Sequence, residues 1–347
     1  MALEVDIEKQ LGPFHLRAAF SCESGFTGIL GASGSGKSMT LKCIAGIEKP
    51  DRGSIVLDGR VLFDSEKKIN LPPQKRHVGY LFQHYALFPG MTVRQNIMCG
   101  LHDVKDRQER EAQADAMMDM LQIRDIASRR IEAISGGQAQ RTALGRILVN
   151  KPDLLMLDEP FSALDTHLRL KLQAELKELL GGYGKGIIMV THDRDEAYRM
   201  CDRLGIMDRG QMQTVKEKKE LFADPETRAA ALLTGCKNIA EARKTGEREV
   251  YVPAWNIHLK TRKTVRDGLQ AVGIRAHSFR LDEKDNAYPV QMIRETEEPF
   301  EWIGEFRFDG QAPDTAPVWW RYPKELRRKK PPKKLGVPPA DVLLLYE

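Results

Sequence analysis

The sequence of 347 residues is 41% hydrophobic and 30% charged, a composition typical of a soluble globular protein with about two domains. Its net charge of +5 comes mainly from residues 237–347, which carry 21 basic and 17 acidic side chains, so we expect no broad face for nucleic acid. The sequence contains no run of 18 apolar residues and no secretory signal, and its five scattered cysteines lack a C-x-x-C pair. This cysteine usage indicates reduced thiols rather than disulfides or a metal site.

Short strands dominate the prediction for the first 82 residues. The alternating or apolar stretches that predict them are 3–7, 14–20, 26–30, the two arms of a hairpin over 54–63, and 78–82. The hairpin should turn at Asp58-Gly59, a pair that favours the left-handed conformations of a two-residue turn. The strand at 78–82 leads directly into Gln83.

Helices and buried strands alternate in the middle of the chain. Helical periodicity is expected over about 104–130, 138–149 and 167–180, the last ended by Gly181-Gly182. Met117, Met118, Met120 and Leu121 supply the apolar content of the first of these, which is typical of helix packing. Leu154–Leu157 and Ile187–Val190 are fully apolar, as expected of strands inside a parallel sheet.

The pattern changes near residues 235–245. A helix that starts near Pro225 should end near Gly235, and only short alternating pieces follow it. We therefore expect an α/β domain over 1–236 and a small all-β domain over 237–347. The segment 321–334 holds eight lysines and arginines, which indicates a solvated loop, with a membrane-surface role as the alternative.

A glycine-rich loop carries the first functional prediction. Its residues are Gly31, Ala32, Ser33, Gly34, Ser35, Gly36, Lys37 and Ser38, the pattern G-x-x-x-x-G-K-S, and Met39 continues from it into a predicted helix. A strand before such a loop and a helix after it are the setting of a phosphate-binding loop, whose backbone N–H groups and helix N-terminus attract anions. Lys37 should reach the β- and γ-phosphates, and Ser38 should offer its hydroxyl to Mg²⁺. The alternative is a glycine-rich surface turn.

Two acids follow the buried strand 154–157. Because α/β sheets build sites at the carboxyl ends of their strands, we expect Asp158 to hold Mg²⁺ through water and Glu159 to polarise the water that attacks the γ-phosphate. The alternative is that both acids only cap the next helix. Ser135-Gly136-Gly137 opens a helix and is either a second anion-binding helix start or a plain N-cap.

Taken together, these motifs resemble those of the ATP-binding cassette (ABC) ATPases. The loop, Gln83, ISGGQAQR, LLMLDEP, SALD at 162–165 and His192 occur in the order of that family, over about residues 1–235. The resemblance implies a P-loop ATPase fold with a helical subdomain and a head-to-tail homodimer with two ATPs. Each ATP would lie between Lys37 of one chain and Ser135, Gly136 and Gly137 of the other.

The resemblance also implies roles for single residues. Asp165 would communicate across the dimer, His192 would sense the γ-phosphate, and Gln83 would join Mg²⁺ to the membrane permease subunits. Residues 84–97 would form the groove for those subunits, which places the chain on the cytoplasmic side of the membrane. A substrate-binding protein would act with it indirectly, and Phe14 is a candidate for stacking on adenine.

The subfamily is indicated by the segment FQHYALFP and by a C-terminal β-domain, both of which resemble bacterial importers. The stretch GRVLFDSEKKINLPPQKRHVGYLFQ is most similar to molybdate importers, so molybdate is the expected solute. Sugar, sulfate and polyamine importers, and a soluble ABC ATPase outside transport, are the alternatives. Five glutamates between 295 and 305 disfavour an anion site at that place.

Overall fold

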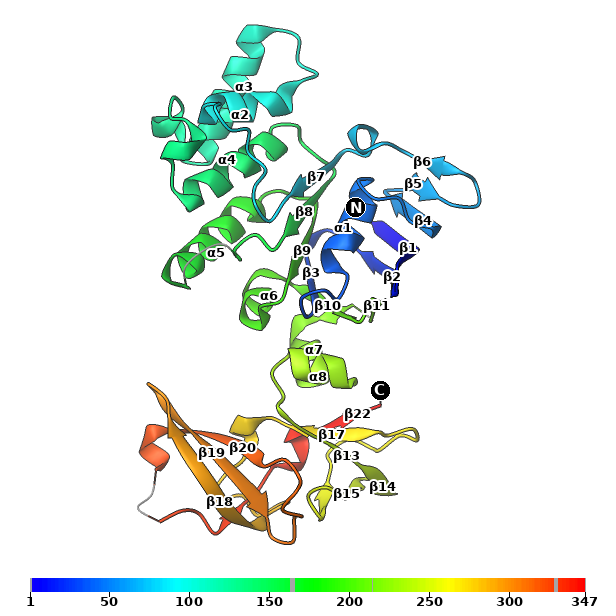
Figure 1. Ribbon diagram of the computed structural model, residues 1–347, viewed down its shortest axis with the longest axis vertical. Coiled ribbons are helices and arrows are strands. Elements are labelled where there is room, and N and C mark those ends of the chain that lie inside the picture. Colours follow the sequence, from blue (N-terminus) through cyan, green and yellow to red (C-terminus); the bar gives the residue numbers. More distant parts are fainter. Residues whose placement is uncertain (1, 163–165, 214, 328–329, 347) are drawn as a thin grey trace. The chain divides into compact units, whose positions relative to one another are not determined.

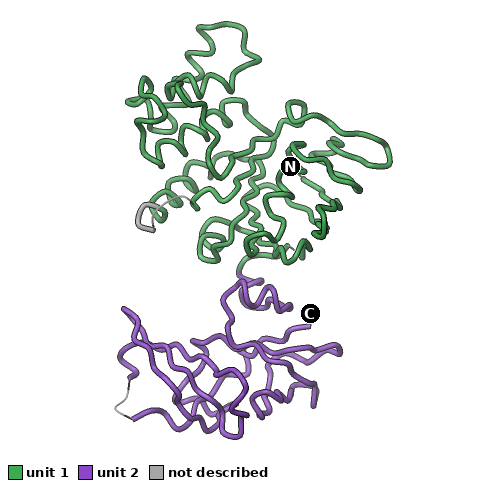
Figure 2. The backbone as a smooth tube through the Cα atoms, in the orientation of Figure 1, with its two compact units in different colours: residues 1–218 green, residues 219–347 purple. Residues whose placement is uncertain are grey.

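The computed structural model describes residues 2–162, 166–213, 215–327 and 330–346 (Figure 1). Contacts divide the chain into two compact units, residues 1–218 (unit 1) and 219–347 (unit 2), which Figure 2 shows in green and purple. None of the described helices is both long and apolar enough to cross a membrane.

In the described part of unit 1, twelve strands form one sheet. Its order is β6-β5-β4-β1-β2-β11-β10-β3-β9-β8-β7, and β12 also pairs with β10. The bounds are β1 Leu3–Leu11, β2 Phe14–Cys22, β3 Gly25–Leu30, β4 Arg52–Leu57, β5 Arg60–Asp64, β6 Ile69–Asn70, β7 Val78–Leu81, β8 Leu154–Asp158, β9 Gly186–Thr191, β10 Arg203–Asp208, β11 Gln211–Met212 and β12 Lys216–Glu217.

The sheet has a parallel part and an antiparallel part. Strands β10, β3, β9, β8 and β7 are parallel neighbours, whereas β1 pairs antiparallel with β2 and β4, and β4 pairs antiparallel with β5. Every residue of β8 and β9 is buried, as their apolar sequences predict. The β4–β5 hairpin turns at the predicted Asp58-Gly59, both with positive φ.

Register brings the carboxyl ends of the parallel strands together. Leu30 is paired with Thr191, Asp158 with Val190 and Leu81 with Leu157. The residues that follow these strands are Gly31, His192, Glu159 and Phe82. The motifs singled out in the sequence therefore emerge at one edge of the sheet.

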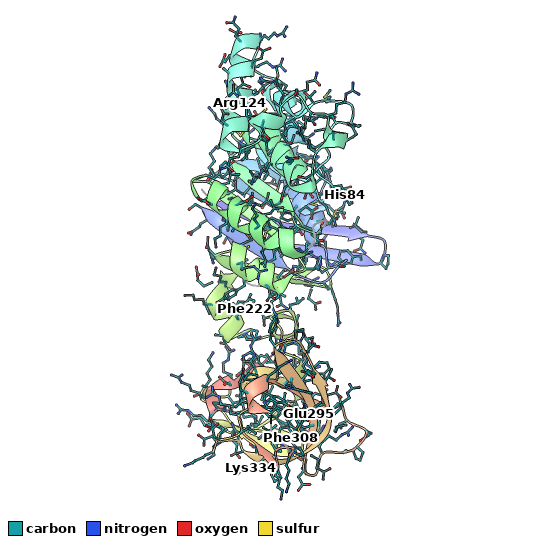
Figure 3. All side chains as sticks on the ribbon, turned by 90° about the vertical axis from the view of Figure 1, so that its left-hand side faces the viewer. His84, Arg124, Phe222, Glu295, Phe308 and Lys334 are labelled. Carbon is teal, nitrogen blue, oxygen red and sulfur yellow. The ribbon has the colours of Figure 1, made fainter. Side chains whose placement is uncertain are left out.

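Helices of unit 1 cover the sheet or gather in a separate lobe. They are α1 Lys37–Ala45, α2 Val93–Met98, α3 Arg107–Met120, α4 Gly136–Leu148, α5 Thr166–Gly181 and α6 Arg194–Met200. Figure 1 shows α2, α3 and α4 together at one end, and Arg124, labelled in Figure 3, follows α3 there. Met118 and Leu121 are buried in the core of this lobe, as predicted, but Met120 is half exposed because it lies on the opposite face of α3.

Unit 2 begins earlier than the predicted boundary after residue 236. Two short helices lie at its start, α7 Lys218–Ala223 and α8 Arg228–Leu233, and Lys218 itself is the last residue of unit 1. The sequence indicated only α8. The Arg275 guanidinium donates to the carbonyls of Thr234 and Phe222, and the Tyr346 N–H donates to the Glu226 carbonyl. These bonds join the segment 222–234 to Arg275 and Tyr346 of the β-domain, and the division between the units falls before this segment.

From Asn238 onward, the described regular elements are strands and short 3-10 turns, as expected of a β-domain. The strands form three antiparallel sheets, β13-β17-β22, β14-β15-β16 and β20-β19-β18-β21. Their bounds are β13 Asn238–Glu241, β14 Arg243–Gly246, β15 Glu249–Val252, β16 Ile257–Lys260, β17 Ala271–Ile274, β18 Tyr288–Glu297, β19 Glu301–Phe308, β20 Val318–Pro323, β21 Lys334–Leu335 and β22 Val342–Leu345. Phe308, labelled inside unit 2 in Figure 3, belongs to their aromatic core.

Candidate nucleotide site

The glycine loop between β3 and α1 is folded tightly. Gly34 and Gly36 have φ of 77° and 108°, a region that glycine enters without strain. A Cβ on Gly31 would lie 2.4 Å from the Met207 carbonyl oxygen and 2.6 Å from Ser35 Oγ. Gly36 is the N-cap of α1 and no side chain caps the helix, so its first N–H groups remain available to an anion.

Ser35 adds an independent sign of a ligand. Its side chain is buried, yet its Oγ has no hydrogen-bond partner among the described residues. Its backbone carbonyl accepts a 3.0 Å bond from the Gly210 N–H, which fixes the position of the residue. A buried hydroxyl without a partner is costly, and a phosphate oxygen in the loop would remove that cost.

Lys37 is buried inside the same loop. Its Nζ donates to the carbonyls of Gly31 and Ala32 at 2.9 Å and lies 3.8 Å from Glu159 Oε1. Burial lowers the pKa of the ammonium, and the nearby carboxylates of Glu159 and Asp158 oppose that shift. The Lys37 ammonium therefore lies inside the loop, where a phosphate would bind.

Asp158 at the end of β8 is held through both carboxylate oxygens. Ser38 Oγ donates to Oδ1 and the Tyr80 hydroxyl donates to Oδ2, each at 2.7 Å. Among the described residues, no group of three or more His, Cys, Asp or Glu side chains could hold a metal ion. The donor set of Ser38 and Asp158 nevertheless fits Mg²⁺, which commonly uses one carboxylate together with substrate phosphates and water.

Glu159 is placed by an unusual backbone conformation. Its φ is +46°, which is strained for a residue with a side chain, and its N–H donates to the Val190 carbonyl at 3.1 Å. Glu159 Oε2 lies 3.1 Å from His192 Nδ1. The two predicted site residues thus meet directly, beside Lys37.

Gln83 reaches this group through a serine. Its amide donates to Ser162 Oγ at 3.3 Å, and Ser162 Oγ donates to the Glu159 carbonyl at 3.0 Å. Two and three residues after Gln83, Tyr85 and Ala86 both have positive φ. The Arg146 guanidinium on α4 donates to the carbonyls of both, which stabilises this turn.

Ser135, Gly136 and Gly137 do not join the cluster within this chain. Ser135 is the N-cap of α4 and forms a capping box with Gln138, and its described bonds are local. Gly137 packs against Leu172 on α5. Asp165 lies outside the described residues. The helix start is exposed at Ser135 and Gly136.

Sequence reasoning missed several residues that support the site. Tyr80 holds Asp158, and the carbonyl of Pro160, directly after Glu159, accepts bonds from Tyr85 and Gln140. Tyr80 could have been noticed because it places a polar hydroxyl at the penultimate position of β7. Phe14, the candidate adenine partner, lies beside the loop, since a Cβ on Gly36 would be 3.2 Å from its ring.

Comparisons with known proteins agree with this geometry. Residues 18–162 match the family model described as "ABC transporter". The spermidine/putrescine import ATP-binding protein PotA of Bacillus cereus is 41% identical over 69% of this chain and 71% of that protein. The molybdenum import ATP-binding protein ModC of Paramagnetospirillum magneticum is 38% identical over 65% of this chain and 62% of that protein.

A solved structure shares the fold. The ATP-binding cassette MJ0796, in a dimeric post-hydrolysis state bound to ADP and Pi, aligns with a TM-score of 0.52 and 26% identity. The alignment covers 63% of this chain and 99% of that one. The chain belongs to the ABC transporter family and is an ATPase of its ATP-binding cassette type.

Proposed function

We propose that this chain is the ATP-binding and ATP-hydrolysing subunit of an importer. The observation that carries the proposal is the convergence of Lys37, Ser38, Asp158, Glu159 and His192 at one edge of the sheet. The relatives described above are import proteins, which supports the direction of transport.

Each residue has a role in the proposed chemistry. The loop from Gly31 to Met39 binds the phosphates, with Lys37 countering their charge. Ser38, Asp158 and Gln83 hold Mg²⁺, which when bound neutralises charge on the phosphates. Glu159 accepts a hydrogen bond from the attacking water and so makes that water more nucleophilic. His192 orients Glu159 and contacts the γ-phosphate.

We also propose that two copies form two composite sites. The bonds of Ser135 among the described residues are local to the start of α4 and do not reach the Lys37 loop, and the similar MJ0796 structure is dimeric. Two-fold symmetry would give each site Lys37 from one copy and Ser135–Gly137 from the other, with Asp165 at the contact.

Mixing two defective variants tests this arrangement. Lys37→Ala and Ser135→Arg chains should each be nearly inactive, whereas a mixed dimer has one intact site and should recover ATP hydrolysis. If mixed dimers form without recovery, a crosslink between Ser35→Cys and Gly136→Cys decides between strict coupling of the sites and a wrong geometry. A crosslink formed only within one chain contradicts the composite site.

Residues 84–97 are the proposed contact with the permease subunits, on the cytoplasmic side of the membrane. Phe88 and Met91 expose 46% and 37% of their surface there. His84, at the start of the segment, is also exposed (Figure 3). Large apolar side chains on an ordered surface segment are typical of a protein interface.

Molybdate is the proposed solute, on the resemblance of residues 59–83. A polyamine is the second candidate, because the Bacillus cereus relative has the higher identity. The glutamates of β18 and β19 give no support to an anion site there: Glu297 pairs with Lys324 at 2.8 Å and Glu301 with Arg321 at 3.2 Å. Sulfate and sugar importers remain further alternatives.

Uptake measurements test the importer proposal and its solute together. Cells that express the chain with candidate permease and binding-protein partners should accumulate radiolabelled molybdate, and Glu159→Gln should abolish this uptake. Uptake of spermidine instead would identify the polyamine alternative. ATP hydrolysis that no permease stimulates, without uptake of either solute, would favour a soluble ABC ATPase.

A further inference from the structure

Tyr80 and Ser38 share the two oxygens of one buried carboxylate. Asp158 exposes only 6% of its surface, and its Oδ1 and Oδ2 accept the Ser38 and Tyr80 hydroxyls, each at 2.7 Å. Tyr80 lies on β7, which is paired in parallel register with β8. The two hydroxyls therefore approach the carboxylate from different elements, one from α1 and one from β7.

The direction of both bonds follows from the chemistry of the groups. A phenol carries its proton at neutral pH and a carboxylate only accepts, so the Tyr80 hydroxyl donates to Asp158 Oδ2. Ser38 Oγ has one hydrogen and two lone pairs, so it can donate to Oδ1 and still offer a lone pair to a cation. Tyr80 therefore bonds to Oδ2 and leaves Oδ1 to Ser38.

The Tyr80 ring is itself fixed by packing. Its centroid lies 4.5 Å from that of Phe82, with the rings tilted by 53°. Phe82 directly precedes Gln83, so the same strand end carries the support of Asp158 and the start of the Gln83 segment. A hydroxyl on a packed ring restricts rotation of the carboxylate more strongly than water does.

We propose that Tyr80 is a positioning residue for the cation that accompanies ATP: it fixes the carboxylate plane of Asp158 so that Oδ1 remains beside Ser38. This inference rests on the proposed Mg²⁺ site. The simpler alternative is that Tyr80 only satisfies a buried carboxylate and supports the fold. The two differ in their effect on metal-dependent and metal-free ATP binding.

The experiment measures the affinity of the full chain for a fluorescent ATP analogue in Mg²⁺ and in EDTA. Tyr80→Phe removes one oxygen and retains the ring. It should reduce the strengthening of binding by Mg²⁺ about tenfold, as is typical when a partner of a metal ligand is lost. Affinity in EDTA should change less than about twofold, because the Tyr80 hydroxyl bonds to Asp158, which acts through the cation in this proposal.

Tyr183→Phe is the matched control. It removes a phenol hydroxyl that donates to the Pro152 carbonyl at 2.6 Å, in the same unit but away from Asp158. Both of its affinities should equal those of the unmodified chain. If Tyr80→Phe lowers affinity equally in Mg²⁺ and EDTA, or changes neither, Tyr80 is not a positioning residue.

A double-variant cycle shows whether Tyr80 acts through Asp158. In an Asp158→Asn background, Tyr80→Phe should produce no further loss of the Mg²⁺ effect. A full tenfold loss in that background contradicts the proposal even if the single variant behaves as expected. If Mg²⁺ does not strengthen binding to the unmodified chain, the proposed metal site fails and the role of Tyr80 fails with it. The two kinds of failure are therefore distinguishable.

Discussion

Unit 1 and unit 2 treat buried polar groups differently. In unit 2, Asn238, Asn286 and Gln311 are buried, and each side-chain amide both donates and accepts bonds within the unit. In unit 1, Ser35 Oγ and Glu196 Oε1 are buried without a partner among the described residues. Both lie close in sequence to Lys37 or His192.

The difference separates groups that stabilise a fold from groups arranged for a ligand. Buried polar atoms are normally satisfied, so an exception needs an explanation. In unit 2 the amides of Asn238 and Asn286 join segments distant in the chain, and the amide of Gln311 joins residues 308–316 around it. Arg307 Nε is a buried exception in this unit. In unit 1, Ser35 Oγ lies in the glycine loop, where a ligand can complete its bonding, whereas Arg110 Nε on α3 and Gln173 Nε2 on α5 are exceptions outside that loop.

The largest expected effect tests the chemistry of unit 1. Glu159→Gln retains the shape of the side chain but removes the charge that polarises water, so ATP hydrolysis should fall about 10²-fold or more while ATP still binds. Phosphate release and analogue binding measure the two properties. Glu66→Gln, in an exposed turn between β5 and β6, is the control. Near-normal turnover of the Glu159 variant would rule out its assigned role.

The next effect tests whether the core of unit 2 stabilises that unit alone or also contributes to ATP binding by unit 1. Phe306 is fully buried and makes edge-to-face contacts with Phe279 and Phe308, so Phe306→Ala should lower the free energy of unfolding of unit 2 by about 3–5 kcal/mol. All four tryptophans, Trp255, Trp302, Trp319 and Trp320, belong to unit 2, so tryptophan fluorescence reports its unfolding.

Affinity for the ATP analogue at a temperature where the Phe306 variant is folded should not change. Phe300→Ala, at a side chain that is 89% exposed, should alter the free energy of unfolding by less than about 0.5 kcal/mol. A large loss of ATP affinity in the Phe306 variant would mean that ATP binding also depends on unit 2.

A smaller effect concerns ground-state binding in unit 1. Lys37→Ala removes a buried ammonium beside the loop carbonyls and should weaken binding of the ATP analogue about 10- to 100-fold. Lys42→Ala, on the same helix α1, is the control and should bind normally. Equal affinities of the two variants would contradict the phosphate-binding role of Lys37.

The smallest effect tests the buried carboxyl of Glu196, whose Oε1 has no hydrogen-bond partner among the described residues. Burial, followed by the charge of Asp193, raises the pKa of Glu196 to about 7, with the Thr191 hydroxyl and Arg169 opposing and Glu159 adding to the rise. Below pH 4.5 the group is protonated in folded and unfolded chains alike. As the pH rises from 4.5 to 7, only the unfolded chain ionises freely, so the folded state loses relative stability.

The free energy of unfolding of Glu196→Gln, relative to that of the unmodified chain, should therefore rise by roughly 1–3 kcal/mol from pH 5 to pH 8. Denaturant unfolding at the two pH values measures this difference. Glu48→Gln, at a partly exposed acid, is the control variant. The same difference at both pH values for Glu196→Gln would mean that folding does not raise the pKa of its carboxyl.

The sequence alone determined the local parts of the site. Spacing identified the glycine loop, the apolar strands before Asp158 and His192, and the helix start at Ser135, because each of these depends on neighbouring residues only. The same local rules predicted the Asp58-Gly59 hairpin and the β-domain after residue 237. They failed for α7, whose short polar sequence has little helical period of its own.

Only the tertiary structure decided which of these parts meet. The register of β3, β9, β8 and β7 brings Gly31, His192 and Glu159 to one edge, and it also places Tyr80 against Asp158. Bonds from Arg275 and Tyr346, not local sequence, join the segment of α7 and α8 to the rest of unit 2. Such contacts join residues far apart in the chain, and their free energy comes from packing and hydrogen bonding that no local window of sequence contains.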